Sequence, residues 1–288
     1  MTHETERNTA RQVKTIIRRA LREDVGCGDA TANYTISAAA RIHGTFLAKG
    51  DGVVAGLEIA RETFAATDKR VKFTSLLADG SKIHRGDVLA RVSGPGRAIL
   101  SAERTALNFL QRMSGIATAT REMVDLTAGF PVVILDTRKT APGLRVIDKM
   151  AVKLGGGENH RMGLDDMILI KDNHIAAVGS ITAAVGSVRR QDRRHRPIEV
   201  EVTNLAELAE TLPLRVDRIL LDNMSLEEMK RAAEMAHGIT PLEASGNITR
   251  ERIRDVAETG VDFISAGALT HSVKALDISL EIGKDHHV

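Results

Sequence analysis

Six short apolar runs, each followed by charged or glycine-containing residues, are the feature of this sequence that most constrains the fold. They recur through the second half of the 288-residue chain and alternate with segments of helical periodicity. Short strands that alternate with helices are typical of a parallel sheet built from βα units. The runs are residues 132–135, 167–170, 198–202, 219–221, 241–242 and 263–264.

Each run ends in residues suited to binding or chemistry. In a parallel α/β barrel the carboxyl ends of the strands converge on one mouth, where the active sites of such barrels lie. Six units are fewer than the usual eight, so the sequence predicts an α/β fold with an open or irregular parallel barrel. The residues interpreted as lining its pocket are 136–139, 171–173, Glu199 with Glu201, 222–223, 243–247 and 266–267.

Composition narrows the possible function classes. A formal net charge of +2, no Trp and a single Tyr argue against a nucleic-acid partner. No apolar stretch approaches membrane-spanning length, and the N-terminal residues lack a signal-peptide core. The single cysteine, Cys27, excludes an internal disulfide and a Cys-based zinc site. The sequence therefore predicts a soluble cytoplasmic protein with no membrane partner.

The first half of the chain has a different pattern. An amphipathic helix around Val13 and Ile17 precedes a small α/β layer in residues 44–96, and a long helix is expected to begin near Ser101. This helix is predicted to carry the boundary between an N-terminal domain, residues 1–115, and a C-terminal domain, residues 116–288.

Positive side chains gather at the first two strand tips. Arg138 and Lys139 follow the first run, Lys171 follows the second, and His160 and Arg161 lie between them in the sequence. Cations at one mouth repel each other unless an anion lies between them, and arginine is a preferred partner of carboxylates and phosphates. Each residue alone is equally explained as a solvated loop residue. Together they predict an anion site.

Arg104 adds a cation from the N-terminal domain. With a helix start near Ser101, it would lie in the first turn, where the helix dipole disfavours positive charge. A nearby anion would offset this placement. Simple solvation beside Glu103 is the alternative.

Carboxylates lie at the next two tips. Glu199 and Glu201 alternate on the third strand and so share a face, and Asp222 ends the fourth strand. Carboxylates opposite cations favour Mg²⁺, which binds one or two carboxylates together with substrate phosphate oxygens. The alternative is a network of ion pairs with Lys139 and Lys171.

The last two tips are small and contain glycine. They are Ser245, Gly246 and Asn247, followed by Ala266 and Gly267. Barrel enzymes often bind phosphate on the backbone N–H groups of their final two loops. A plain tight turn explains either loop equally well.

Two sequence blocks are specific enough to indicate a family. They are Thr-Arg-Lys-Thr at residues 137–140 and Gly-Gly-Gly-Glu-Asn-His-Arg at residues 155–161. With further blocks along nearly the whole chain, they make the sequence resemble the quinolinate phosphoribosyltransferase family, also called nicotinate-nucleotide pyrophosphorylase (carboxylating). The further blocks are residues 23–29, 103–108, 170–174, 199–202, 220–223, 243–247 and 264–268.

The resemblance implies a small N-terminal α/β sandwich and a C-terminal open α/β barrel, with residues 274–288 packing back on the N-terminal domain. It implies a homodimer or higher oligomer in which one subunit's N-terminal domain closes the partner's barrel mouth, so that Arg104 acts in trans. The implied reaction, a step of NAD biosynthesis, joins quinolinate to phosphoribosyl pyrophosphate with Mg²⁺. It gives nicotinate mononucleotide, pyrophosphate and CO₂.

The expected residue roles follow from this reaction. The residues expected to bind quinolinate are Arg104, Thr137, Arg138, His160, Arg161 and Lys171. Those expected to bind phosphoribosyl pyrophosphate are Lys139, Lys171, Glu201, Asp222, Ser245, Gly246, Asn247, Ala266 and Gly267. Lys139, Glu201 and Asp222 are the expected catalytic residues, and the two carboxylates are expected to hold Mg²⁺ directly or through water.

Three other interpretations stay open. A molybdenum-transport-associated paralogue shares the scaffold, although the intact cations favour quinolinate. A barrel aldolase or lyase would use Lys139 or Lys171 to form a Schiff base. A non-catalytic nucleic-acid-binding module would use the basic run at residues 189–196, which has no aromatic residues around it.

Overall fold

The structure of the chain is a computed structural model that describes residues 3–283, with side chains described from residue 7. These residues form two compact units. Unit 1 comprises residues up to 121, Thr140–Gly156 and residues from 273, and unit 2 comprises Glu122–Lys139 and Gly157–Ser272. Each unit is assembled from segments that are distant in the sequence, whereas the sequence analysis divides the chain once, between residues 115 and 116.

Unit 1 is built on a four-stranded antiparallel sheet with the order β12-β1-β5-β3. Strand β12 pairs along β1, with Leu280 beside Phe46. Residues 284–288 of the segment expected to pack back lie outside the described residues. The strands are β1 (Arg41–Ala48), β3 (Lys72–Ser75), β5 (Val88–Pro95) and β12 (Ile278–Ile282), and β2 (Gly52–Val53) and β4 (Lys82–Ile83) form a separate ribbon.

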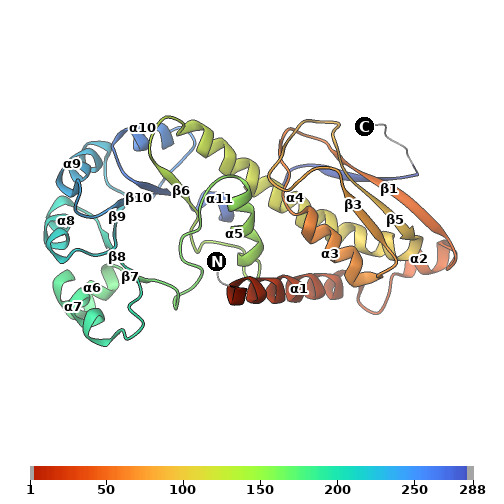
Figure 1. Cartoon of the computed structure of the whole chain (residues 1–288), viewed down its shortest axis with the longest axis horizontal. Coiled ribbons are helices and arrows are strands. Elements are labelled where there is room, and N and C mark those ends of the chain that lie inside the picture. The colour runs from red at the N-terminus through yellow and green to blue at the C-terminus, as the bar shows by residue number, and fades with distance from the viewer. Residues whose placement is uncertain (1–2, 284–288) are drawn as a thin grey trace. The chain divides into compact units, whose positions relative to one another are not determined.

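Helices pack on this sheet and close an apolar core (Figure 1). Phe46 of the sheet, Phe64 of α3 and Leu107 of α4 are buried in one cluster. The predicted amphipathic helix is α1, which buries Val13 and Ile17. The helices are α1 (His3–Val25), α2 (Ala30–Thr35), α3 (Leu57–Thr67), α4 (Gly96–Leu126) and α5 (Arg145–Leu154).

The long helix begins earlier than the sequence predicts. Strand β5 ends at Pro95 and α4 starts at Gly96, five residues before the expected start at Ser101. Arg104 therefore lies beyond the second turn of α4, where the helix dipole no longer acts on it strongly, and its side chain is exposed. The prediction that Arg104 lies in the first turn is therefore wrong, and the helix dipole gives no reason to expect an anion beside it.

Unit 2 is built on a six-stranded parallel sheet with the order β6-β11-β10-β9-β8-β7. All six apolar runs form its strands, so the predicted α/β fold class is confirmed. Within residues 3–283 the edge strands β6 and β7 are not joined to each other, so the sheet is open. The strands are β6 (Val133–Leu135), β7 (Ile168–Ile170), β8 (Ile198–Val202), β9 (Arg218–Asp222), β10 (Leu242–Ser245) and β11 (Phe263–Ser265).

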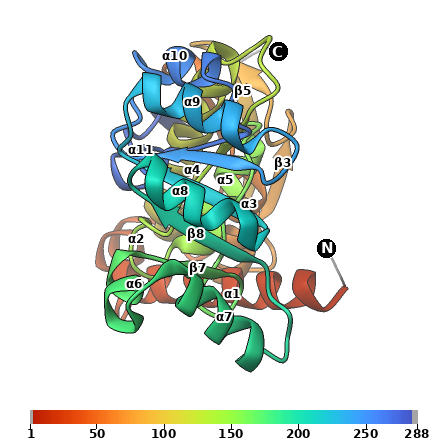
Figure 2. The ribbon, with the colours of Figure 1, turned by 90° about the vertical axis from the view of Figure 1, so that its left-hand side faces the viewer.

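Short helices follow most strands and cover the outer face of the sheet; Figure 2 views unit 2 with α8 and α9 toward the reader. Asn204 caps α8, and Ser225 and Glu228 form a capping box at the start of α9. No helix in residues 3–283 is long and apolar enough to cross a membrane. The helices are α6 (Asp172–Val178), α7 (Ile181–Gln191), α8 (Leu205–Thr211), the 3₁₀ turn η1 (Leu212–Leu214), α9 (Leu226–Ala236), α10 (Ile253–Glu258) and α11 (Ala268–His271).

The two faces of this parallel sheet differ in chemistry. Side chains alternate along a strand, so Val200, Ile219 and Leu242 share one face and are buried beneath the helices. The opposite face carries polar residues at the intervening positions. Parallel register places Ser245 of β10 beside Asp222 of β9, at neighbouring strand tips.

Candidate active site

A cavity of about 220 Å³ lies at the carboxyl ends of the strands of unit 2. This is the end at which parallel α/β sheets bind their ligands. The polar residues come from the ends of all six strands of the sheet and from the loop before β7. The cavity is lined by Thr137, Arg138, Lys139, His160, Arg161, Leu169, Lys171, Glu201, Leu220, Asp222, Glu243, Ser245 and Ser265.

Backbone hydrogen bonds hold the tip after β6 in place. The buried carboxylate of Asp136 accepts the N–H of His160 at 2.9 Å. The N–H of Lys139 donates to Thr137 Oγ1 at 3.0 Å, and the carbonyl of Lys139 accepts the hydroxyl of Thr270 at 2.8 Å. The cationic tip is therefore tied both to the loop before β7 and to α11.

Arg161 presents a partly desolvated positive charge to the cavity. Its side chain donates from Nη1 to the carbonyl of Met167 at 3.0 Å, and only 9% of the residue is exposed. Burial lowers the pKa of the Arg161 guanidinium, and the nearby charge of Arg138 lowers it further. An anion placed between the two guanidinium groups would relieve both effects.

Lys171 is already paired. Its Nζ donates to Glu201 Oε2, and the backbone N–H of Lys171 donates to His174 Nδ1 at 2.9 Å. This pair corresponds to the ion-pair alternative that the sequence left open. The same ammonium and carboxylate nevertheless line the cavity, where a ligand can reach both.

At the base of the cavity lies a largely buried network of four polar side chains, those of His160, Glu199, Arg218 and Glu243. His160 Nε2 is 3.0 Å from Glu199 Oε2 and 3.6 Å from Glu243 Oε1. Arg218 donates from Nη1 to Glu243 Oε2 at 2.7 Å, and its guanidinium carbon lies 3.9 Å from the ring centroid of Phe263. Glu199, which the sequence analysis placed among the strand-tip carboxylates, is fully buried.

The hydrogen bonds assign the tautomer of His160. Its Nδ1 accepts the N–H of Arg161 at 2.7 Å, so the ring proton lies on Nε2, toward Glu199. His160 acts at the base of the cavity as a hydrogen-bonding group.

Burial raises the pKa values of both carboxyl groups in the network, those of Glu199 and Glu243. For Glu199, the positive charge of Arg218 opposes this rise. For Glu243, burial and then the charge of Glu199 raise the pKa to about 7, although His160 and Arg218 lower it. Both carboxyl groups therefore favour the protonated form more than an exposed glutamate does.

Two groups of residues have donor atoms that suit a metal ion. Donor atoms of His160, Glu199 and Glu243 lie within 4.8 Å of one another. Arg218 already neutralises part of their charge, so a buried divalent cation would leave excess positive charge. Glu201 and Asp222 instead line the open cavity, where carboxylate oxygens and ligand oxygens can bind a hard cation together.

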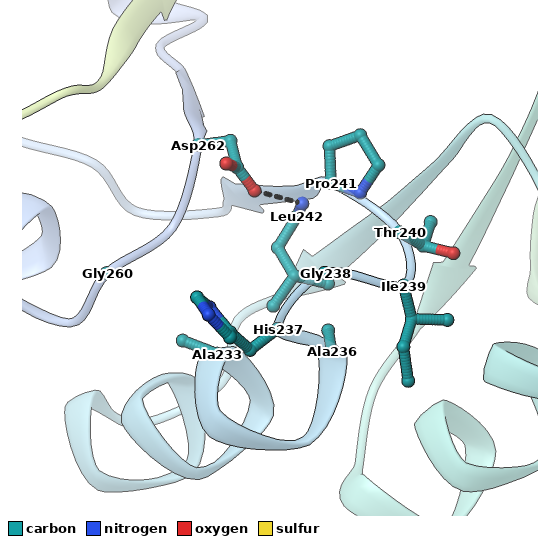
Figure 3. A pocket seen from close by; sticks show the side chains of 10 residues that line it. All are labelled: Ala233, Ala236, His237, Gly238, Ile239, Thr240, Pro241, Leu242, Gly260 and Asp262. Carbon is teal, nitrogen blue, oxygen red and sulfur yellow. Dashed lines mark hydrogen bonds between the residues drawn. The ribbon is translucent and has the colours of Figure 1, made fainter.

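A second cavity, of about 330 Å³, lies at the amino ends of β10 and β11 (Figure 3). Its carboxylate, Asp262, accepts the backbone N–H of Leu242 at 2.8 Å, and His237 and Ile239 also line it. It has no arginine or lysine among its lining residues. In parallel barrels this end is associated with stability rather than catalysis, so it is not the candidate site.

Some of the expected site residues do not line the cavity. Arg104 belongs to unit 1. Gly246, Asn247 and Ala266 lie in the loops that follow β10 and β11 and are not among the lining residues. A Cβ on Gly267 would lie 3.1 Å from Lys139 Cδ, so this glycine allows the lysine stem to pass close to the backbone.

The sequence pattern did not indicate Leu169, Leu220 or Ser265 as cavity residues, whereas Glu243, part of the predicted 243–247 tip, does line the cavity. Strand periodicity was the available signal, because each missed residue lies two positions from another inward-facing or tip residue. For example, Leu169 precedes Lys171 and Leu220 precedes Asp222 by two positions. No local pattern indicates that Arg218 joins this network, because its partner Glu243 lies on the next strand.

Comparisons with known proteins identify relatives of the whole chain. The family model described as "Quinolinate phosphoribosyl transferase, N-terminal domain" matches residues 29–114, and the corresponding C-terminal domain model matches residues 116–281. Quinolinate phosphoribosyltransferase (decarboxylating) 1 from Nicotiana glauca is 46% identical, over 94% of this chain and 82% of the relative. The chloroplastic nicotinate-nucleotide pyrophosphorylase (carboxylating) of Arabidopsis thaliana is 47% identical over the same shares.

Solved structures are similar over the same extent. NadC from Streptococcus pyogenes superposes with a TM-score of 0.91 at 40% identity, and covers 94% of this chain and 96% of its own. The nicotinate-nucleotide pyrophosphorylase from Francisella tularensis gives a TM-score of 0.90 at 41% identity, with the same coverage.

Proposed function

The chain belongs to the quinolinate phosphoribosyltransferase family, and we propose that it transfers the phosphoribosyl group of phosphoribosyl pyrophosphate to quinolinate with loss of CO₂. The products are nicotinate mononucleotide, pyrophosphate and CO₂. The observation that carries this proposal is one cavity at the carboxyl ends of a parallel sheet whose lining combines two sets of charges. The guanidinium groups of Arg138 and Arg161 are called here the cationic side, and the carboxylates of Glu201 and Asp222 are called the acidic side.

The cationic side suits quinolinate, which has two carboxylates on a flat ring. Arg138 and Arg161 bind one or both carboxylates, and the Thr137 hydroxyl donates a further hydrogen bond. Leu169 and Leu220 provide apolar contact for the pyridine ring. The lowered pKa of Arg161 supports this assignment, because a dianion restores the stability of the charged guanidinium.

The acidic side suits the phosphoribosyl donor. Glu201 and Asp222 would hold Mg²⁺ directly or through water, and the bound ion would supply positive charge for the pyrophosphate group. Lys139 and Lys171 contact the phosphates as point charges. Ser245 to Asn247, together with Ala266 and Gly267, supply backbone N–H groups.

The proposed reaction begins when the ring nitrogen of quinolinate attacks the anomeric carbon and pyrophosphate leaves with the bonding electrons. Positive charge builds on the ribose, where Glu201 and Asp222 stabilise it. The quaternised nitrogen then holds the electrons released as the adjacent carboxylate departs as CO₂, and a proton takes its place on the ring. This reaction needs no general base from the protein, because positioning of the substrates and electrostatic stabilisation are sufficient for catalysis. Lys139 contributes positive charge next to the departing pyrophosphate.

Assembly and location are further parts of the proposal. We infer a homodimer in which Arg104, an exposed residue of α4, enters the partner's cavity and adds a third guanidinium for quinolinate. We also infer a cytoplasmic location, although the name of the Arabidopsis thaliana relative gives that protein as chloroplastic. A heterodimer of an Arg104→Ala subunit with an Arg138→Ala subunit tests the trans role, because it regains one intact site.

Incubation with quinolinate, phosphoribosyl pyrophosphate and Mg²⁺ tests the function. We expect nicotinate mononucleotide, pyrophosphate and CO₂ to form in equal amounts. No pyrophosphate release under these conditions would refute the proposal. If the protein were instead a Schiff-base lyase, borohydride would trap a carbonyl substrate on a lysine. The pairing of Lys171 with Glu201 disfavours Lys171 as that lysine, because the carboxylate stabilises the ammonium form and a Schiff base needs the neutral amine.

A further inference from the structure

Two neighbouring strand tips of unit 2 have unusual backbone conformations. Asn223, directly after β9, has a φ of 56°, and Asn247, two residues after β10, has a φ of 49°. Left-handed backbone is uncommon outside glycine, and asparagine is one of the residues that tolerate it. Such conformations cluster where the surrounding structure needs them.

Hydrogen bonds orient the side-chain amide of Asn223. Its Nδ2 donates to Asp222 Oδ2 at 3.0 Å, and its Oδ1 accepts from Asn247 Nδ2 at 3.1 Å. The backbone N–H of Asn223 donates to the carbonyl of Ser245 at 3.0 Å. One residue thus connects the Asp222 carboxylate to both ends of the 245–247 loop.

Gly246 allows this connection. Its φ is 89°, and a Cβ built on it would lie only 2.3 Å from Asn223 Oδ1 and 2.5 Å from Asn223 Cγ. The Asn223 amide is therefore pressed flat against the backbone of Gly246. A side chain at position 246 would displace it.

We propose that Asn223 is a positioning residue that fixes the Asp222 carboxylate relative to the 245–247 loop and so pre-forms the phosphoribosyl pyrophosphate half of the site. This inference rests on the proposed function, which assigns both elements to that substrate. Asn223 is exposed, so its bonds contribute little to the core. Their effect is on geometry, since misplaced ligand groups cost far more in catalysis than in folding.

The two halves of the site are held by different bonds. Asn223 orients Asp222 and the 245–247 loop, whereas on the quinolinate side Asp136 accepts the N–H of His160 and the carbonyl of Met167 holds the side chain of Arg161. Substitution of Asn223 should therefore affect one substrate and leave the other unchanged. A loss of affinity for one substrate alone distinguishes a positioning role of Asn223 from a general loss of structure, which would weaken the binding of both substrates.

The first test compares Asn223→Gly and Asn223→Asp with Arg215→Gly. Arg215 is also exposed, with a φ of 47°, so its replacement by glycine makes the same backbone change away from the cavity. Asn223→Gly keeps the backbone conformation and removes the amide. Asn223→Asp keeps the shape but puts an acceptor opposite the Asp222 carboxylate, where a donor is needed.

For both Asn223 variants we expect KM for phosphoribosyl pyrophosphate and the Mg²⁺ concentration for half-maximal rate to rise about 10- to 100-fold. Calorimetric titration with quinolinate should give wild-type affinity, and titration with phosphoribosyl pyrophosphate and Mg²⁺ should show the loss directly. Arg215→Gly should match wild type in every measurement.

A second test uses Gly246→Ala alone and combined with Asn223→Gly. If the Asn223 amide is what the added methyl group displaces, Gly246→Ala should weaken phosphoribosyl pyrophosphate binding much less in the Asn223→Gly background than in wild type. Fully additive effects would contradict a shared mechanism.

The inference is overturned if Asn223 variants bind phosphoribosyl pyrophosphate like wild type, or if they lose affinity for both substrates equally. In either case wild-type turnover of quinolinate would leave the proposed function intact. Failure of the wild-type protein to release pyrophosphate would instead remove the proposed function itself.

Discussion

The core of unit 1 and the sheet face beneath the cavity of unit 2 bury different kinds of side chain. The core of unit 1 is apolar: Phe46 packs edge-on against Phe64 and Phe73, with ring centroids 6.0 Å and 5.5 Å away. Beneath the cavity of unit 2, the buried positions are instead occupied by charged and polar groups, among them Glu199 and Glu243.

This difference shows where the molecule tolerates change. An apolar core is held by non-directional burial, so it accepts small changes of shape at modest cost. A buried charged network is stable only while its members are paired, and loss of one partner leaves another charge desolvated. Unit 2 retains such a network directly below residues assigned to the reaction, where it orients His160 and the Arg161 loop.

The largest expected effect on stability is in the apolar core. Phe64→Ala should lower the free energy of unfolding by about 3–5 kcal/mol, because it removes a fully buried ring and leaves a cavity. Denaturant unfolding measures this loss. Tyr34→Ala, at a site 90% exposed, is the matched control and should change stability by less than about 0.5 kcal/mol. Equal losses in the two variants would contradict the assignment of Phe64 to the core.

Lys139→Ala should have the opposite effect to Phe64→Ala, because it should reduce activity without reducing stability. Lys139 is exposed at the cavity, so its removal should leave the unfolding midpoint unchanged and reduce kcat by about 100- to 1000-fold. Steady-state kinetics with both substrates measure the loss. Lys153→Ala, at an exposed position of α5, serves as the control. A Lys139→Ala variant with the wild-type rate would exclude this lysine from the transition state.

The charged network should give unit 2 a pH dependence that the apolar core lacks. The pKa of Glu243 is raised from 4.5 to about 7, so the folded state binds this proton more tightly than the unfolded state. Its contribution to stability is full below pH 4.5 and is lost as pH rises to about 7. The groups that face it are His160, Glu199 and Arg218.

Glu243→Gln isolates this contribution, because the amide does not titrate. The difference in unfolding free energy between wild type and variant should shrink steadily from pH 4.5 to 7 and then stay constant. Measurements at several pH values with one denaturant are sufficient. A difference that stays constant across this range would mean that Glu243 is ionised throughout it.

The smallest expected effect sharpens the comparison from the apolar side. Ile99→Val removes one methylene from the core of unit 1 and should cost about 0.5–1.5 kcal/mol. The cost should be the same at pH 5 and pH 7, since no ionisable group is involved. A clear pH dependence would indicate that this core is coupled to titrating groups.

Features set by neighbouring residues were predictable from the sequence. All six strands of unit 2 follow from the apolar runs, and the caps at Asn204 and Ser225 follow from residues within three positions. The convergence of the tips on one cavity also followed, because parallel strands present their carboxyl ends on one side.

Features set by distant residues were not predictable. The start of α4 was misplaced because β5 runs directly into it at Gly96, with no polar cap to mark the boundary. Helix α10 begins at Ile253 without a side-chain cap, although Thr249 lies just before it and accepts the N–H groups of Arg252 and Ile253 with its backbone carbonyl. The contact of Arg218 with Glu243 depends on strand order, which no local pattern reveals.

The pairing of β12 with β1 has a consequence for biosynthesis. Strand β1 ends at Ala48, yet its outer neighbour is not synthesised until residues 278–282. On the ribosome, the segments of unit 2 up to Ser272 emerge before that neighbour exists. During most of translation one edge of β1 is therefore open to pairing with another nascent chain, a state in which β-edges promote aggregation.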